Sequence, residues 1–182
     1  LQQQPAAKVV LPGWRVETRL QGWPVQVQGV VDHPAYRSRW PLLEQHAQAW
    51  QQLAQGKGVM LSEQLARRLG LGVGDILALA TDGAPPMTVV GVYADYGNPK
   101  GHVLVNADWL RKHWPQATLT GLSLDSAPAN VPALKAALQQ RFVELGVWIR
   151  PFNNLIYLMP PFIIRPDQLS KLTAAMRTVV GI

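Results

Sequence analysis

The chain has 182 residues, and 17 lysine and arginine residues against 11 aspartate and glutamate residues give it a formal charge of +6. Hydrophobic residues make up 48%, which is too apolar for a disordered chain, and the length suits one domain of ordinary size or one domain with two lobes. The absence of cysteine excludes disulfides, thiolate metal sites and cysteine nucleophiles.

The basic residues are scattered as singles and pairs. A nucleic-acid-binding protein is expected to gather them into a patch or a dense run, so their distribution argues against that partner. No stretch reaches the roughly 18 to 20 apolar residues that cross a bilayer, because Pro160 and Pro161 interrupt the most apolar one, 155–164. The chain starts at Leu1 without a signal-peptide pattern, and we expect it to be an excised piece of a longer protein, a membrane protein among the candidates.

The first part of the chain predicts a lead-in, a strand and a helix. We expect residues 1–13, which begin with a glutamine-rich stretch, to be a disordered lead-in. Residues 25–31 alternate apolar and polar side chains, which is typical of a half-buried strand that ends before Pro34. Residues 41–53 place apolar side chains at helical spacing behind a first-turn proline, which predicts one helix.

The middle of the chain predicts a helix between short strands. Ser62 is a suitable N-cap for this helix, and Gly70 is suited to its C-cap. Asp82-Gly83 is a hairpin signal between two of the strands. The predicted strands cover 58–61, 76–80, 87–93 and 102–105.

The last part of the chain continues the mixture of helices and strands. We expect helices over 107–114, 132–145 and 166–180, and strands over 119–124, 147–149 and 155–158. The last two strands are predicted to pair as a hairpin about residues 151–154. This order favours an α+β fold with mixed sheets, β-hairpins and packed helices over a doubly wound parallel sheet.

The residues themselves predict no catalytic set, no cofactor motif and no metal site. The four histidines lack the short paired spacing of metal ligands, so each is interpreted as a structural or surface residue. The most polar and aromatic loop holds Asp95, Tyr96, Asn98 and Lys100. This loop is either a contact region or a turn shaped by its glycines and proline.

Residues 58–75, GVMLSEQLARRLGLGVGD, resemble a segment of the extracytoplasmic domain of FtsX-like ABC transporter permeases, the group related to MacB and the Lol lipoprotein extractors. The family's Val-Val-Gly-Val hairpin end is matched at 89–92, and a weaker likeness extends over 14–138. The resemblance implies a two-lobed, non-enzymatic domain at the periplasmic face of the inner membrane, with 58–105 as its β-rich lobe. It implies contact with a lipid or lipoprotein substrate or an accessory protein, and motion relayed from a separate cytoplasmic ATPase.

Residues 138–180 are similar to the C-terminal end of the biotin-pathway aminotransferase that makes diaminopelargonate, through RFVELGVWIRPF and LIYLMPPFII. In that family the arginine matching Arg150 binds a substrate carboxylate, and the tyrosine matching Tyr157 lies near it. The lysine-bearing domain that holds pyridoxal phosphate is missing, so the resemblance implies at most a vestigial carboxylate site without activity or cofactor.

The two resemblances meet in one predicted helix, near Ala137–Phe142. Residues 139–182 are expected to form a β-hairpin and helix that complete the fold. Either the chain is a chimera or one half of a natural sequence carries a chance likeness. We therefore predict a non-enzymatic extracytoplasmic permease domain, with a fragment or chimera carrying part of an aminotransferase small domain as the alternative.

Overall fold

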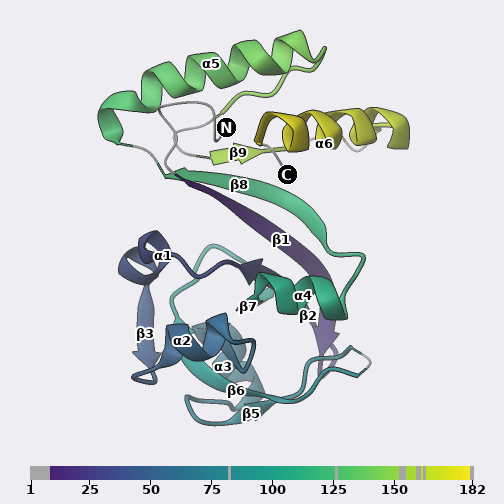
Figure 1. Cartoon of the computed structure of the whole chain (residues 1–182). Helices are drawn as coiled ribbons and strands as arrows, with labels where there is room; N and C mark the ends of the chain where they lie inside the picture. Colours follow the sequence, from purple (N-terminus) through teal and green to yellow (C-terminus); the bar gives the residue numbers. More distant parts are fainter. Residues whose placement is uncertain are drawn as a thin grey trace. The chain divides into compact units, whose positions relative to one another are not determined.

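The computed structural model describes residues 9–81, 83–125, 127–151, 155–158, 161 and 163–180. The chain divides into two compact units (Figure 1). One unit comprises residues 13–119, and we call it the central unit; the other combines residues 1–12 with 120–182, and we call it the terminal unit.

The central unit contains a mixed sheet with strand order β3-β6-β4-β7-β2-β1. Its strands are β1 (Val9–Leu20, which starts in the terminal unit), β2 (Trp23–Val30), β3 (Leu42–Gln45), β4 (Gly58–Ser62), β5 (Ile76–Leu77), β6 (Met87–Tyr93) and β7 (Gly101–Asn106). The β1–β2 hairpin turns at Gln21 and Gly22, whose φ values of +49° and +79° are typical of a two-residue hairpin turn. β2 and β7 run parallel, as do β4 and β6, whereas β4 and β7 are antiparallel.

Four helices accompany this sheet: α1 (Pro34–Arg39), α2 (Ala49–Ala54), α3 (Glu63–Leu69) and α4 (Ala107–His113). α4 lies across β2 (Figure 1), where a Cβ on Gly29 would stand 2.9 Å from Ala107 Cα. Neighbouring residues of β4 join different apolar clusters: Val59 and Leu61 belong to the cluster that includes α3 and α4, and Met60 to the one that includes α2. Both faces of β4 are therefore buried, as its continuous apolar sequence requires.

The terminal unit is built from β8 (Thr118–Asp125, which starts in the central unit), a 3₁₀ turn (Pro128–Asn130), α5 (Val131–Glu144), β9 (Leu155–Tyr157) and α6 (Pro166–Val180). β8 and β9 pair antiparallel, with Gly121 opposite Tyr157. α5 packs against α6, and its inward side chains Leu134, Leu138 and Phe142 are all buried. The α+β class predicted from the sequence is confirmed.

The helix predicted over residues 41–53 is wrong. The chain forms the edge strand β3 there, turns, and begins α2 only at Ala49. The reason is tertiary pairing: β3 pairs antiparallel with β6, and the His46 N–H donates to Val90 O at 2.9 Å. Helical spacing of apolar residues does not reveal such a long-range partner. The sequence also missed α1, whose first turn is capped by the His33 Nδ1, which accepts the Ala35 N–H at 3.2 Å.

The hairpin predicted about residues 151–154 is also wrong. Residues 147–149 form no strand, and β9 pairs with β8 instead. The Val147 N–H is used to close α5, donating to Phe142 O at 3.0 Å. Residues 152–154 lie outside the described residues.

Other differences concern ends and caps. The strand predicted over 76–80 shortens to β5, and Asp82 of the hairpin signal lies outside the described residues. Ser62 occupies the N-cap position, yet its side chain makes no capping hydrogen bond; its Oγ accepts the His102 N–H at 3.1 Å instead. Gly70 ends α3 with φ +66°, as predicted. β1 includes residues 9–13 of the predicted lead-in, and residues 1–8 lie outside the described residues.

Candidate functional site

The loop between β6 and β7 holds the four predicted contact residues and is tied to the first hairpin. Lys100 Nζ donates to Glu17 Oε2 of β1 at 2.8 Å, and Asn98 Oδ1 accepts the Lys100 N–H at 3.1 Å. Burial of the Glu17 carboxyl acts to raise its pKa, but hydrogen bonds from Lys100 and Gln26 outweigh it and lower the pKa overall. The loop is therefore anchored at a residue 83 positions away in sequence.

A polar pocket of about 270 Å³ opens beside this loop. Its lining residues come from β1, β2, β6, β7, the loop, and the connection between α1 and β3. They are Arg15, Gln26, Trp40, Pro41, Tyr93, Ala94, Asp95, Asn98 and His102. Of the predicted contact residues, Asp95 and Asn98 lie in its wall. Lys100 and Glu17 border a separate hollow of about 620 Å³.

Tyr96 belongs to neither hollow. Its side chain is 71% exposed, and hydrogen bonding to Glu63 of α3, together with the charge of that carboxylate, raises the pKa of its phenol. The structure thus brings Asp95 and Asn98 together and separates Tyr96 from them.

His102 is the most constrained polar residue of the pocket. It is only 8% exposed, and its Nδ1 lies 2.8 Å from Tyr93 Oη and 3.4 Å from Asp95 Oδ2. Burial lowers the His102 pKa to about 4, although the Asp95 charge acts in the opposite direction. Burial, with the nearby Asp95 charge, raises the Tyr93 pKa well above its usual value. The imidazole is therefore neutral at pH 7.

Two buried nitrogens of this pocket have no hydrogen-bond partner among the residues that the structure describes: Trp40 Nε1 and His102 Nε2. Leaving such a group unpaired costs about 1–3 kcal/mol. Trp40 is held rigidly, because its ring packs edge-on against Tyr36, Trp50 and Tyr93, at centroid distances of 5.6, 6.3 and 5.7 Å. Both residues line the pocket, but the two nitrogens themselves are closed off from solvent, so they are unsatisfied groups behind the pocket wall.

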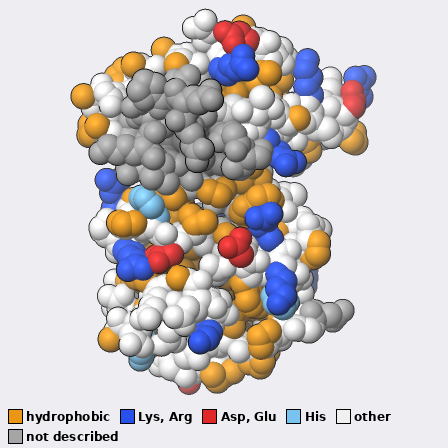
Figure 2. All heavy atoms as spheres, in the orientation of Figure 1, with side chains coloured by type: hydrophobic (Ala, Val, Ile, Leu, Met, Phe, Trp, Pro, Cys, Tyr) orange, Lys and Arg blue, Asp and Glu red, His pale blue; other side chains and the backbone are white. Residues whose placement is uncertain are grey.

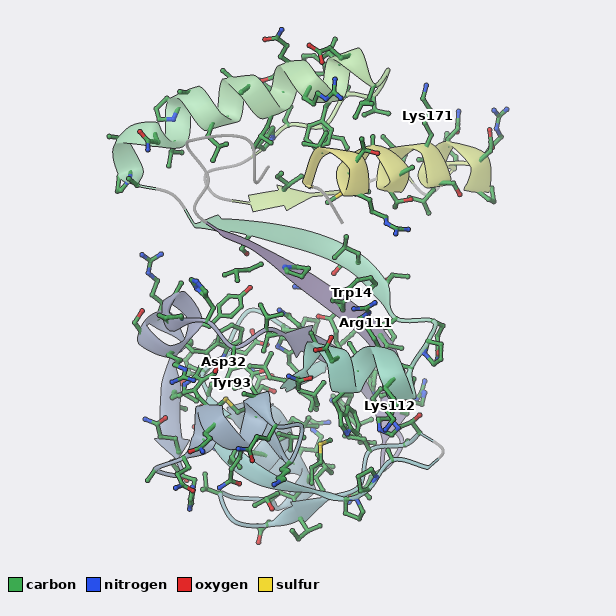
Figure 3. The ribbon with its side chains drawn as sticks, viewed as in Figure 1. Trp14, Asp32, Tyr93, Arg111, Lys112 and Lys171 are labelled. Carbon is green, nitrogen blue, oxygen red and sulfur yellow. The ribbon has the colours of Figure 1, made fainter. Side chains whose placement is uncertain are left out.

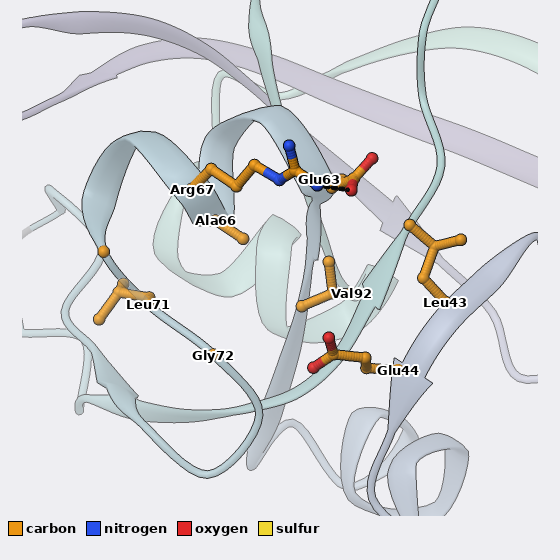
Figure 4. A pocket seen from close by; sticks show the side chains of 9 residues that line it. Leu43, Glu44, Glu63, Ala66, Arg67, Leu71, Gly72 and Val92 are labelled. Atoms are coloured by element: carbon orange, nitrogen blue, oxygen red, sulfur yellow. Dashed lines mark hydrogen bonds and ion pairs between the residues drawn. The ribbon is translucent and has the colours of Figure 1, made fainter.

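A second hollow, of about 530 Å³, lies between α3 and β3 (Figure 4). The register of β3 against β6 shifts between Leu42 and Glu44, so Leu43 and Glu44 both line this hollow although they are consecutive. Arg67 Nη2 is paired with Glu63 Oε1 at 2.6 Å. The polar groups of this hollow are thus solvent-exposed or already paired.

Outside the hollows, two cationic side chains of the central unit lie over tryptophan rings. The Arg111 guanidinium lies over the Trp14 ring at 4.9 Å (Figure 3), and that of Arg68 over the Trp23 ring at 3.3 Å. On the face shown in Figure 2, basic side chains are spread out rather than gathered. Charge therefore marks no site on this face.

The remaining predicted site residues lie in the terminal unit. Arg150 is exposed between the buried residues Ile149 and Pro151, and Tyr157 is the last residue of β9. Within the described ranges, no group of three or more histidine, aspartate or glutamate side chains is placed to hold a metal ion. No helix among the same residues is long and apolar enough to cross a membrane.

Sequence reasoning missed the central residues of the pocket: Arg15, Trp40, Tyr93 and His102. One feature of the sequence could have indicated His102: it is a polar residue directly before the apolar run 103–105. The other three are unremarkable until the sheet places them next to it.

The family model of the MacB-like periplasmic core domain matches residues 2–141. The chain belongs to this family. The match ends inside the segment where the two resemblances meet. A solved structure with the same fold is the periplasmic region of MacB from Actinobacillus actinomycetemcomitans, with a TM-score of 0.58 and 12% identity over 95% of this chain and 78% of that one.

Two curated relatives reflect both resemblances. An uncharacterized ABC transporter permease protein of Mycobacterium tuberculosis is 31% identical over 139 residues, 75% of this MacB-like chain and 16% of the relative. Adenosylmethionine-8-amino-7-oxononanoate aminotransferase of Buchnera aphidicola is 62% identical over 37 residues, 20% of this chain and 9% of the relative. The chain therefore spans only a small part of the curated relatives that it matches.

Proposed function

We propose that this chain is the extracytoplasmic domain of an ABC transporter permease, and that it acts by binding and mechanical coupling rather than by catalysis. Membership of the MacB-like periplasmic core domain family carries the proposal. The substrate or accessory protein binds at the polar pocket and the loop Asp95–Lys100. A cytoplasmic ATPase drives the motion through transmembrane segments of the parent protein.

The contacts of the loop support a coupling role. The loop joins β6 to β7 and is held to β1 by the ion pair between Lys100 and Glu17. The pocket beside it draws its wall from residues as distant in sequence as Arg15 and His102. A ligand that binds there contacts several strands at once, so its binding energy depends on how those strands are arranged.

The test is ATP-driven transport in vesicles that hold the permease with this domain and its ATPase. Replacing residues 95–100 by glycine and serine at constant length is expected to abolish transport while ATP hydrolysis continues. A matched control changes the exposed turn after α4, Pro115→Ser with Gln116→Gly, and is expected to transport normally. Full transport by the loop variant contradicts the proposed role.

The second candidate function concerns the likeness to the aminotransferase, and the 62% identity over 37 residues favours it. In this alternative, Arg150 and Tyr157 form a vestigial carboxylate site without activity. The chain is then expected to show no lysine-imine absorbance after incubation with pyridoxal phosphate. Such an absorbance would overturn the non-enzymatic assignment.

A further inference from the structure

The hollow of about 530 Å³ between α3 and β3, which we call the α3–β3 groove, lies at an open edge of the sheet. β3 ends the order of the strands, so among the described residues no strand lies on its outer side. An edge strand leaves backbone N–H and C=O groups unpaired on that side, and another chain can pair with them.

Hydrogen bonds hold this edge in place on both sides of β3. Directly before β3, Pro41 O accepts the Ala94 N–H at 3.0 Å. Directly after it, the His46 N–H donates to Val90 O at 2.9 Å. β3 is therefore anchored in the extended conformation that strand pairing needs, which lowers the entropy cost of binding a partner there.

Two apolar side chains of the groove are open to solvent. Leu43 is 50% exposed, and the shift in register places it on the groove side together with Glu44. Leu71 is half-buried on the opposite side of the groove, with Val92 of β6 between the two leucines (Figure 4). A single exposed leucine is ordinary on a protein surface. Here it lies beside an open strand edge and an exposed carboxylate.

The groove carries a local negative charge although the chain as a whole carries +6. Glu63 is paired with Arg67 Nη2 at 2.6 Å and is hydrogen-bonded to Tyr96. The exposed Glu44 carboxylate forms no hydrogen bond or ion pair with the described residues. Two carboxylates and one guanidinium line the groove, so one negative charge is in excess. Because charges more than about 8 Å away are largely screened at physiological ionic strength, this local charge decides which side chain binds beside Glu44.

We infer that the α3–β3 groove binds an extended segment of a partner protein, which pairs with β3 and presents one apolar and one basic side chain to the groove. Alternate residues of a strand point to the same face, so two residues separated by one lie over the groove together. The apolar side chain covers Leu43, and the basic one pairs with Glu44. β3 is short, bulged and charged, features that protect an edge from unselective pairing, so both side chains are needed beside the backbone hydrogen bonds.

The α3–β3 groove shares no lining residue with the polar pocket. This inference therefore goes beyond the proposed function and names a second contact surface of the domain.

The experiment follows the backbone amide signals of the whole chain by nuclear magnetic resonance while a short peptide is added. The probe is the acetylated and amidated peptide Thr-Leu-Thr-Lys-Thr, whose leucine and lysine point to the same face of a strand. We expect it to shift the signals of residues 43–45 saturably. One control peptide has glutamate in place of lysine. The other carries an N-methyl group on every residue, so it keeps the side chains but has no backbone N–H donor. Each control is expected to bind at least about fivefold more weakly.

A charge exchange tests the role of Glu44. Glu44→Lys is expected to bind the glutamate peptide more tightly than the lysine peptide, which is the reverse of the order for the unchanged chain. Because Glu44 is exposed on an edge strand, the substitution should leave the fold intact. The same order of the two peptides in both proteins would overturn the inference.

The matched apolar variants are Leu43→Thr and Ile76→Thr, which keep a residue suited to a strand. Leu43→Thr is expected to weaken binding of the lysine peptide about fivefold. Ile76 is the control because it is 61% exposed on β5, which also pairs with β6, but it does not line the groove. Ile76→Thr should change binding less than about twofold, and equal losses in the two variants would contradict the inference.

Three further outcomes overturn the inference. Equal binding of the N-methylated peptide excludes strand pairing, and the absence of any saturable shift excludes the site. Shifts at residues 43–45 that grow with the concentration of the chain alone mean that a second copy occupies the edge. The transport test of the loop variant is independent of these results: peptide binding together with normal transport rejects only the coupling role, and lost transport without peptide binding rejects only the α3–β3 groove.

Discussion

The two units of this chain bury their apolar residues in different ways. The central unit packs helices around a sheet whose middle strand β4 is buried along its whole length, and it holds the polar pocket. In the terminal unit, α5 and α6 pack together, and the buried side chains of α5 are Leu134, Leu138 and Phe142. A sheet brings residues that are far apart in sequence side by side, which is how Arg15, Tyr93 and His102 come to share one site.

Substitutions in the apolar core of the terminal unit, and at polar residues and glycines of the central unit, test this contrast. Hydrogen exchange read peptide by peptide assigns each effect to its unit.

The largest effect is expected from the core of α5. Phe142 is fully buried, so Phe142→Ala removes a large side chain and leaves a cavity; it should lower the unfolding free energy by about 3–5 kcal/mol. Exchange is expected to rise in α5 and α6. Val143→Ala is the matched control, because Val143 is the next residue along α5 and its side chain is 51% exposed. This substitution should change the unfolding free energy by less than about 0.5 kcal/mol. Equal effects of the two variants would refute the burial of Phe142.

The next effect is a pH dependence centred on His102. Its pKa is about 4 in the folded protein and 6.5 in the unfolded chain, so between these values the unfolded chain holds more protons. Stability is therefore expected to be constant above pH 7 and to fall by about 2–3 kcal/mol as the pH drops from 6.5 to 4. The facing charges are those of Asp95, Arg15 and Glu17.

Denaturant unfolding at a series of pH values measures this dependence. His102→Gln should remove most of the slope between pH 6.5 and 4. The control His46→Gln removes an exposed histidine and should keep the slope. A His102→Gln protein with an unchanged slope would mean that other groups cause it.

A smaller effect is expected where α4 approaches β2. A Cβ added at Gly29 would lie 2.9 Å from Ala107 Cα and 2.9 Å from Leu110 Cδ2, and backbone cannot move aside as a side chain can. Gly29→Ala should lower the unfolding free energy by about 1–3 kcal/mol, measured by denaturant unfolding. Gly97→Ala is the control, because no atom lies within 4 Å of a Cβ there. If both substitutions are neutral, α4 and β2 are not this close.

The distance in sequence between interacting residues explains which parts of the fold the sequence predicts. α4, α5 and α6 follow from apolar spacing and local caps, such as Asn106 Oδ1 accepting the Trp109 N–H at 2.9 Å. β3 does not, because its partner β6 lies more than forty residues further along the chain. Two of the loop residues, Asp95 and Asn98, were found as a polar cluster, whereas Trp40 and His102 become a site only through strand order.

The smallest effect is expected from the ion pair between Glu17 and Lys100, whose side chains are 54% and 46% exposed. Because water and salt screen such a pair, a double-mutant cycle of Glu17→Gln and Lys100→Met should give a coupling of about 0.2–1 kcal/mol, and less at high salt. In the transporter the same variants should clearly reduce coupled transport although they change stability little, because the ion pair fixes the loop beside the pocket. A Glu144→Gln and Arg141→Met cycle on α5, whose side chains are 48% and 53% exposed, is the matched control: its coupling should be similar, but transport should be unchanged. If both cycles leave transport unchanged, the tie between the loop and β1 contributes to neither binding nor coupling.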